Sequence, residues 1–129
     1  MILFLDFDGC LHTIGGPIFA HADRLAKRGY DLVLVGRNAD KLDGLAAELS
    51  ARHSVVATAL VADLGEAAGL AQVEHRLETD PSITLLVNSA GLLGGGPLSA
   101  GNVEDLASML TVNVIALTRL SSVAAKAFA

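Results

Sequence analysis

Short aliphatic runs alternate with longer amphipathic stretches along the whole chain, and this alternation limits the possible folds more than any other feature. Each run is rich in Leu, Val, Ile and Ala and is bounded by polar residues or glycine, which is typical of a buried β-strand. The runs occupy residues 2–7, 31–36, 55–62 and 83–88. The remaining stretches favour helices over about 17–28, 39–52, 66–79 and 102–129.

This order of elements predicts an α/β fold with a doubly wound parallel sheet of at least four strands. Right-handed crossovers between the strands would place helices on both faces of that sheet. Apolar residues make up 52% of the chain, as expected when both faces of a parallel sheet are buried. With 129 residues and no linker or internal repeat, we expect a single domain, residues 1–129.

Charge and composition exclude several classes of protein. The net charge is −5 and no basic patch is present, so we expect neither nucleic-acid binding nor attraction to an anionic membrane. No uninterrupted apolar run is long enough to span a bilayer, and Asp6 interrupts the N-terminal run too early for a signal peptide. A single cysteine cannot form an internal disulfide. We therefore expect a soluble, cytoplasmic protein.

Four segments resemble the N-terminal part of the short-chain dehydrogenases/reductases. They are LAKRGYDLVLVGRN (25–38), VADL (61–64), LLVNSAG (85–91) and LTVNVIALTRL (110–120). Each segment ends a strand or faces the crevice at the carboxyl ends of the strands, where dinucleotides bind in such sheets. The resemblance covers residues 25–129 and leaves residues 1–24 as a divergent head. It implies a Rossmann-like sheet with strand order 3-2-1-4 in a single, incomplete domain.

The resemblance implies an NADP cofactor. Arg37 follows the second strand with no acidic residue after it, and an arginine pairs well with a 2′-phosphate, whereas NAD recognition uses a carboxylate there. By the same resemblance Asp63 faces the adenine, and Asn88, Ala90 and Gly91 line the rest of the site. Two simpler interpretations stay open, in which Arg37 is a solvated surface residue and Asp63 caps the next helix.

The phosphate-binding loop of the family is altered in this chain. The family's three glycines are expected near positions 12, 16 and 18, which hold His12, Gly16 and Ile18. Bulky side chains there would prevent close approach of a pyrophosphate to the backbone. Asp6 and Asp8 add negative charge near the same strand end. We therefore expect weak or lost NADP binding.

The head offers an alternative. Residues 1–16, with FLDFDG at their centre, resemble the first motif of the haloacid dehalogenase-like phosphohydrolases. That resemblance implies Asp6 as nucleophile, Asp8 as general acid/base and both as ligands of Mg²⁺, because a hard cation must offset the repulsion between a carboxylate and a phosphate. The alternatives are thus a magnesium-dependent phosphohydrolase or an acidic turn of purely structural origin.

The catalytic set of the family is incomplete. By resemblance Asn113 is the catalytic asparagine, but no Tyr-x-x-x-Lys is present: Tyr30 is the single tyrosine, and Leu34 stands four residues later. A tyrosine is useful as an acid near neutral pH only beside a cation that lowers its pKa. We therefore expect a truncated short-chain dehydrogenase/reductase-like domain without oxidoreductase activity on its own.

The C-terminal segment, 102–129, predicts a helix that is apolar on most sides and therefore buried. Asn113 lies on one of its apolar stripes, where it needs buried hydrogen-bond partners or costs about 1–3 kcal/mol. Related enzymes use this helix between subunits, so we expect a homo-oligomer, such as a dimer, through it. A third function is therefore a non-catalytic dimerising module. The stripes comprise Leu106, Met109, Leu110, Asn113, Leu117 and Leu120, and Val112, Ile115, Ala116, Leu120 and Val123.

Overall fold

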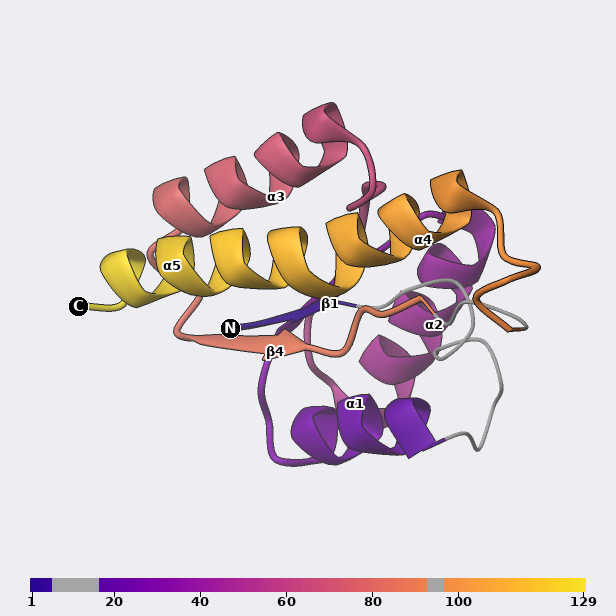
Figure 1. Ribbon diagram of the computed structural model, residues 1–129. Coiled ribbons are helices and arrows are strands. Elements are labelled where there is room, and N and C mark those ends of the chain that lie inside the picture. Colours follow the sequence, from indigo (N-terminus) through magenta and orange to yellow (C-terminus); the bar gives the residue numbers. More distant parts are fainter. Residues whose placement is uncertain (6–16, 93–96) are drawn as a thin grey trace.

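The structure, a computed structural model, describes residues 1–5, 17–92 and 97–129 (Figure 1). Its centre is a four-stranded parallel sheet of order β3-β2-β1-β4, which confirms the expected fold and strand order. The strands are β1 (Ile2–Leu5), β2 (Leu32–Gly36), β3 (Ala57–Val61) and β4 (Leu85–Asn88). The helices are α1 (Pro17–Lys27), α2 (Ala39–His53), α3 (Ala67–Thr79), α4 (Val103–Leu110) and α5 (Leu117–Ala127), with a π-helical segment, η1 (Thr111–Ala116), between the last two.

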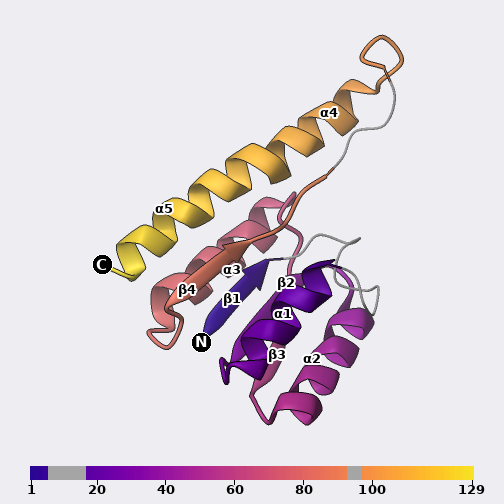
Figure 2. The same cartoon turned by 90° about the horizontal axis from the view of Figure 1, so that it is seen from below.

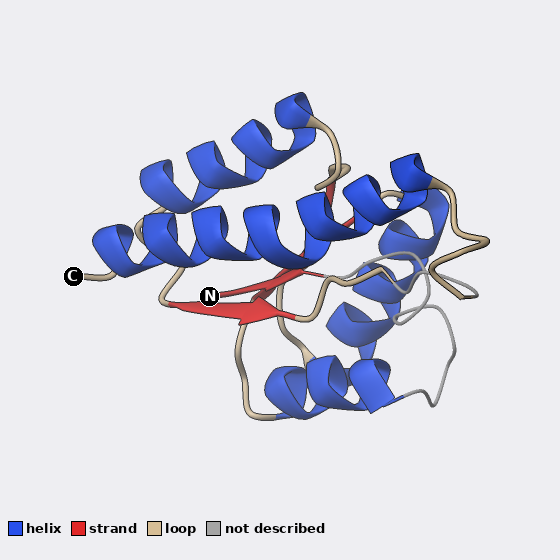
Figure 3. Cartoon of the chain, viewed as in Figure 1, coloured by secondary structure: helices blue, strands red, loops and turns tan. Residues whose placement is uncertain are grey.

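Helices cover both faces of the sheet, as the doubly wound fold requires (Figures 1 and 3). Strand β2 is buried along its whole length, and its residues alternate between the two layers. Leu32 and Leu34 belong to the core cluster shared with α1 and α2, whereas Val33 and Val35 belong to the cluster shared with α3 and α5. This alternation is the period of two that an extended strand imposes. It explains why β2 consists of aliphatic residues without a polar face.

The direction of winding reverses at β1. The chain passes from β1 to β2 and β3 in one direction, and then returns to place β4 on the other side of β1. Helices α1 and α2 therefore lie on one face, and α3 with the C-terminal helix lies on the other (Figure 2). In open α/β sheets, ligands bind beyond the carboxyl ends of the strands where this reversal occurs. The topology thus indicates that a ligand would bind at the edge beyond β1 and β4.

The C-terminal helix differs from the expectation of one regular α-helix. Residues 111–116 adopt π-helical geometry between α4 and α5. This segment, TVNVIA, contains four β-branched residues, whose restricted side chains crowd the preceding turn of an α-helix. Single-turn π segments inside α-helices are frequent at functional sites, and this one contains Asn113.

Two ion-pair clusters tie neighbouring helices together. The Asp23 carboxylate of α1 accepts hydrogen bonds from His53 Nε2 at 2.6 Å and Arg52 Nη1 at 3.2 Å of α2. On the other face, Arg119 of α5 binds both carboxylate oxygens of Glu74 in α3, at 2.6 and 2.9 Å. The hydrogen bond from His53 lowers the pKa of Asp23, and that from Arg119 lowers the pKa of Glu74. Both carboxylates are therefore held in the charged form.

Helix α1 ends at Lys27, and a glycine follows two residues later. Gly29 has φ +88° and its N–H donates to the Ala26 carbonyl at 2.9 Å, which closes the last turn. A Cβ atom at Gly29 would meet no atom within 4 Å, so only the backbone conformation opposes a side chain there. Gly44, inside α2, also faces open space but has no positive φ.

We expect Gly29→Ala to destabilise the fold by about 1 kcal/mol, because alanine is strained at positive φ. Gly44→Ala is the matched control, and it should stabilise the fold by about 0.5–1 kcal/mol, because alanine favours a helix interior. Urea unfolding followed by far-UV circular dichroism measures both changes. Equal effects at the two positions would contradict the assignment of Gly29 as a left-handed helix cap.

One helix of the described chain, Val103–Ala127, is long and apolar enough to cross a membrane when judged by length and composition alone. The expectation that this helix is buried is wrong, because only 17% of its most apolar stretch is buried. The buried part is the stripe that packs in the core, formed by Val112, Ala116, Leu120 and Ala124. The expectation of no membrane-spanning segment stays a prediction.

Candidate cofactor-binding site

The candidate site lies at the carboxyl edge of the sheet. Arg37 comes directly after β2, Asp63 comes two residues after β3, and Asn88 is the last residue of β4. The strand register pairs Gly36 with Val61 and Leu5 with Asn88, so the strands end close to one line. Residues from distant parts of the sequence therefore come to a single edge, as the sequence predicts for a parallel sheet.

Arg37 and Asp63 form one half of this edge. The Arg37 Nη1 atom lies 3.9 Å from Asp63 Oδ2, and the two side chains are 38% and 37% exposed. An ion pair with this length and exposure stabilises the fold by about 1 kcal/mol at most. Both groups keep an open side toward solvent. The edge beyond β2 and β3 thus offers a cation and a carboxylate within reach of the same ligand.

Asp63 closes a turn rather than capping helix α3. Its Oδ1 atom accepts a hydrogen bond from the Gly65 N–H at 2.8 Å. The N-cap of α3 is Glu66, whose side chain makes no capping bond. The helix-cap interpretation of Asp63 is therefore wrong in detail, because the side chain reaches only two residues ahead. The turn fixes the direction of the carboxylate at the strand end.

Gly69 holds α3 against this turn, and the sequence analysis did not identify it. A Cβ atom at Gly69 would lie 2.1 Å from the Asp63 carbonyl oxygen and 2.7 Å from its nitrogen. Because both are backbone atoms, no rotation of a side chain relieves the overlap. The first turn of α3 therefore packs directly on the backbone of Asp63, which only glycine permits.

Asn113 forms the other half of the edge, where it clamps the loop that follows β4. Its Oδ1 accepts from the Leu92 N–H and its Nδ2 donates to the Leu92 carbonyl, both at 2.7 Å. A Cβ atom at Gly91 would lie 3.5 Å from Asn113 Oδ1, an ordinary contact. The hydrogen-bond partners that the sequence required for Asn113 are thus the two backbone groups of one partly buried residue. The clamp ties β4 to the π-helical segment.

Asn88 and Ala90 connect the strand end to the core. Asn88 Nδ2 donates to Ser121 Oγ of α5 at 3.1 Å. Its Oδ1 is buried and has no hydrogen-bond partner in the described part of the chain. Ala90 packs against the core cluster of α3 and α5. Asn88 therefore presents an unmet acceptor at the end of β4, while Ala90 contributes mainly to packing.

The structure does not describe every residue singled out by the sequence. Asp6, Asp8, His12 and Gly16 lie outside the described residues, and so does the side chain of Ile18. Within residues 1–5, 17–92 and 97–129, no group of three His, Cys, Asp or Glu side chains is placed to hold a metal ion. The magnesium alternative therefore concerns residues for which no geometry is available.

Sequence reasoning missed Gly69, Leu92 and Ser121. Leu92 and Ser121 act through a backbone group and a short hydroxyl, which have no spacing pattern that a motif search detects. Gly69 offered a weak signal, because a glycine inside a predicted helix costs about 1 kcal/mol and so often has a packing reason. The cluster of β-branched residues around Asn113 was a second signal, in this case for the irregular helix.

The fold and its edge define an α/β domain of the dinucleotide-binding type. The sequence profile of the short chain dehydrogenase family matches residues 9–129, and the chain belongs to this family. The match begins ahead of residue 25, where the four resembling segments start. Asp6 and Asp8 lie outside the matched residues.

Solved structures support this assignment. A short-chain dehydrogenase from Sphingobium yanoikuyae in complex with NADPH is 40% identical, with a TM-score of 0.87 over 99% of this chain and 49% of that chain. A bulky-bulky ketone specific alcohol dehydrogenase from Comamonas testosteroni is 34% identical, with a TM-score of 0.86 over 99% of this chain and 50% of that chain. The fold and family predictions are confirmed.

The curated relatives are more distant and longer. A very-long-chain 3-oxoacyl-CoA reductase from Anas platyrhynchos is 31% identical over 107 residues, which are 79% of this chain and 34% of that protein. The chain thus spans about a third of the length of this relative and about half of the solved structures that it matches.

Proposed function

We propose that this chain is an NADP-binding domain of the short-chain dehydrogenase type that has no oxidoreductase activity on its own. The observation that carries the proposal is the Arg37 guanidinium at the end of β2, still 38% exposed beside Asp63. An arginine there can form paired hydrogen bonds with a 2′-phosphate. The NADPH complex of the Sphingobium yanoikuyae enzyme, 40% identical, supports the same cofactor.

The described residues fit the adenosine end of the cofactor. Arg37 would hold the 2′-phosphate, and Asp63 would lie beside the adenine with its position fixed by the bond to Gly65. The unmet acceptor on Asn88 would face a donor beyond β4. When bound, NADPH supplies a hydride. Asp63 also offsets part of the charge on Arg37, which favours weak binding.

The position of the single tyrosine supports the proposed lack of activity. Tyr30 lies between α1 and β2, at the amino-terminal end of β2, and is 47% exposed. The candidate site lies at the opposite, carboxyl end of the strands. Tyr30 is therefore unable to act as general acid beside Asn113. This chain contains no second tyrosine to take that role.

The test is calorimetric titration with NADPH and NADH, each with and without Mg²⁺. We expect NADPH to bind weakly but more tightly than NADH, and Arg37→Gln to lower NADPH affinity about fivefold, which is about 1 kcal/mol. Arg76→Gln, at the far end of α3, removes the same charge as a control and should change affinity less than about twofold. NADPH oxidation with a carbonyl substrate should stay at background.

Three results would contradict this proposal. Equal affinity for NADH and NADPH would show that Arg37 does not bind the 2′-phosphate. Steady NADPH-dependent carbonyl reduction would show that the chain is active alone. If neither nucleotide gives binding heat, and Mg²⁺ gives binding heat that Asp6→Asn abolishes, the phosphohydrolase alternative would be favoured.

We also propose that the chain self-associates through its C-terminal helix. Val103, Leu110, Val114 and Leu117 are 42–72% exposed and recur at helical spacing. An exposed apolar stripe of this kind marks an interaction surface. The opposite stripe of the same helix packs in the core.

Replacing Leu117 with glutamate should dissociate the oligomer while leaving the monomer folded, because the side chain is exposed. Sedimentation velocity over a range of concentrations measures the association, and circular dichroism checks the fold. Ser122→Glu, exposed but off the stripe, should leave the sedimentation coefficient unchanged. A monomer at all concentrations of the unmodified chain would refute this proposal.

A further inference from the structure

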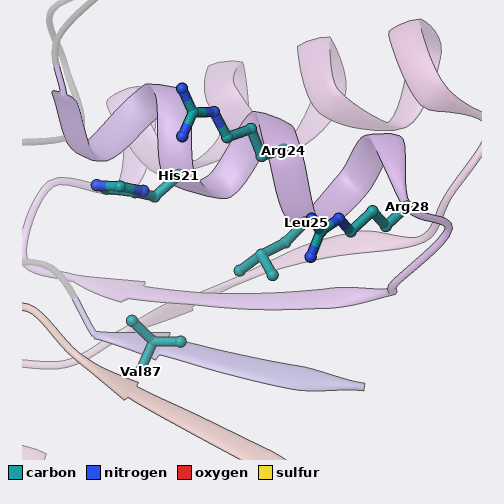
Figure 4. A pocket seen from close by; sticks show the side chains of 5 residues that line it. All are labelled: His21, Arg24, Leu25, Arg28 and Val87. Carbon is teal, nitrogen blue, oxygen red and sulfur yellow. The ribbon is translucent and has the colours of Figure 1, made fainter.

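A cavity lies between α1 and β4. It has a volume of about 340 Å³ and is lined by His21, Arg24 and Leu25 of α1, by Arg28 directly after that helix, and by Val87 of β4 (Figure 4). This volume lies in the range of small-molecule sites, about 300–1,000 Å³. The cavity is on the face of the sheet that α1 and α2 cover, because Val87 packs against their core cluster.

The floor of the cavity is apolar. Leu25 and Val87 are partly buried at the margin of the core cluster. Figure 4 shows their side chains pointing toward one another across the space between helix and strand. A ligand with an apolar body would cover both side chains and so remove further apolar surface from water.

The rim of the cavity is cationic, and its arginines differ from the others in the chain. The sequence contains six arginines. Four of them pair with carboxylates: Arg37 with Asp63, Arg52 with Asp23 and Glu48, Arg76 with Asp80, and Arg119 with Glu74. Arg24 and Arg28 make no ion pair with any other described residue.

The lack of an ion pair at Arg24 and Arg28 is unexpected in a chain with 14 acidic and 9 basic residues. Carboxylates outnumber cations, yet no described carboxylate pairs with the two arginines that share this cavity. The single acidic residue of α1, Asp23, pairs with α2 instead. Among the described residues, no carboxylate therefore offsets the positive charge at this cavity, which lies above an apolar floor.

We propose that this cavity binds an amphipathic organic anion, namely a carboxylate on a short apolar chain. The apolar chain would lie on Leu25 and Val87, and Arg28 would hold the carboxylate. Figure 4 shows the Arg28 side chain running toward Leu25 on the strand-facing side of α1, whereas the Arg24 guanidinium is turned away from Val87. The planar fork of an arginine matches the two oxygens of a carboxylate. None of its lining residues belongs to the candidate cofactor site, and the proposal does not depend on NADP binding.

The test uses sodium octanoate as the probe and octanamide as a neutral probe of the same length. Titration is followed by calorimetry and by the methyl signals of Val87 in a methyl-labelled sample, with saturating NADPH absent and then present. We expect octanoate to shift the Val87 methyl signals and to bind at least about tenfold more tightly than octanamide. NADPH should leave octanoate affinity unchanged.

Arg28→Gln should weaken octanoate binding about tenfold, and Arg28→Lys should weaken it less, because the charge remains. Lys27→Gln is the matched control: it removes one exposed cation from the same helix outside the cavity lining and should change affinity less than about twofold. Both positions are exposed, so circular dichroism should show an unchanged fold for all three variants.

Five outcomes would overturn the proposal. Equal affinity for octanoate and octanamide would show that no anion site exists. Octanoate binding without a response at Val87, or in competition with NADPH, would place the probe elsewhere. An equal loss of octanoate affinity in Arg28→Gln and Lys27→Gln would show that only the net charge of the protein matters. Binding of an acidic peptide without binding of octanoate would assign the surface to a protein partner.

Discussion

Gly69→Ala is expected to destabilise the fold by about 3 kcal/mol or more, the upper end of what overpacking usually costs. The added Cβ would lie 2.1 Å from the Asp63 carbonyl oxygen, so α3 must move away from the turn after β3. Alanine favours a helix interior over glycine by about 1 kcal/mol, and the overlap outweighs that gain. Urea unfolding followed by circular dichroism measures the difference, since the chain has no tryptophan.

Two other glycines provide a graded control. A Cβ atom at Gly65 would lie 3.1 Å from the Asp63 side chain, which can give way, and one at Gly44 would meet nothing within 4 Å. The loss of stability should therefore fall from Gly69→Ala to Gly65→Ala and reverse at Gly44→Ala. A Gly69→Ala protein as stable as the unmodified chain would show that α3 does not pack on the Asp63 backbone.

Asn113→Leu is expected to destabilise the fold by roughly 2 kcal/mol, because it leaves the N–H and carbonyl of Leu92 without partners in a partly buried place. The variant should lose local stability as well as global stability, because the residues directly after β4 are released from the π-helical segment. Hydrogen exchange at the Leu92 amide should accelerate relative to amides in β2. Urea unfolding and exchange measured by NMR test both expectations.

Two variants separate the clamp from a general effect on the helix. Asn113→Asp keeps the acceptor for the Leu92 N–H but places a carboxylate oxygen against the Leu92 carbonyl, so its loss should be of similar size or larger. Thr111→Val removes only the bond from Thr111 Oγ1 to the Ala107 carbonyl and should be nearly neutral. Unchanged exchange at Leu92 in Asn113→Leu would rule out the clamp.

The candidate site followed from the sequence only in part. Arg37, Asp63 and Asn88 could be placed at one edge, because each follows a predicted strand and parallel strands end on the same side. Their contacts could not be placed, since they depend on distances of a few ångströms. Asp63 thus bonds Gly65 instead of capping α3, and Asn88 bonds Ser121, 33 residues away.

The π-helical segment shows the same limit. The apolar stripes predicted a helix from residue 102 onward, but they did not predict its π-helical segment. Its position is stabilised by the bonds between Asn113 and Leu92, which lie 21 residues apart in the chain. Local propensity disfavours regular helix at these β-branched residues, and a tertiary contact selects where the irregular turn occurs.

The amino-acid sequence was sufficient for the α/β class, the order of the strands and the family, because hydrophobic periodicity and short motifs are local properties that survive without the fold. The tertiary structure decided the role of individual residues. Asn113 holds the backbone of Leu92, Gly69 is the point of contact between α3 and a turn, and Arg28 lies beside a cavity without an ion-pair partner in the described part of the chain. These roles arise from contacts between residues that are distant in the chain, and such contacts exist only after the layers have packed.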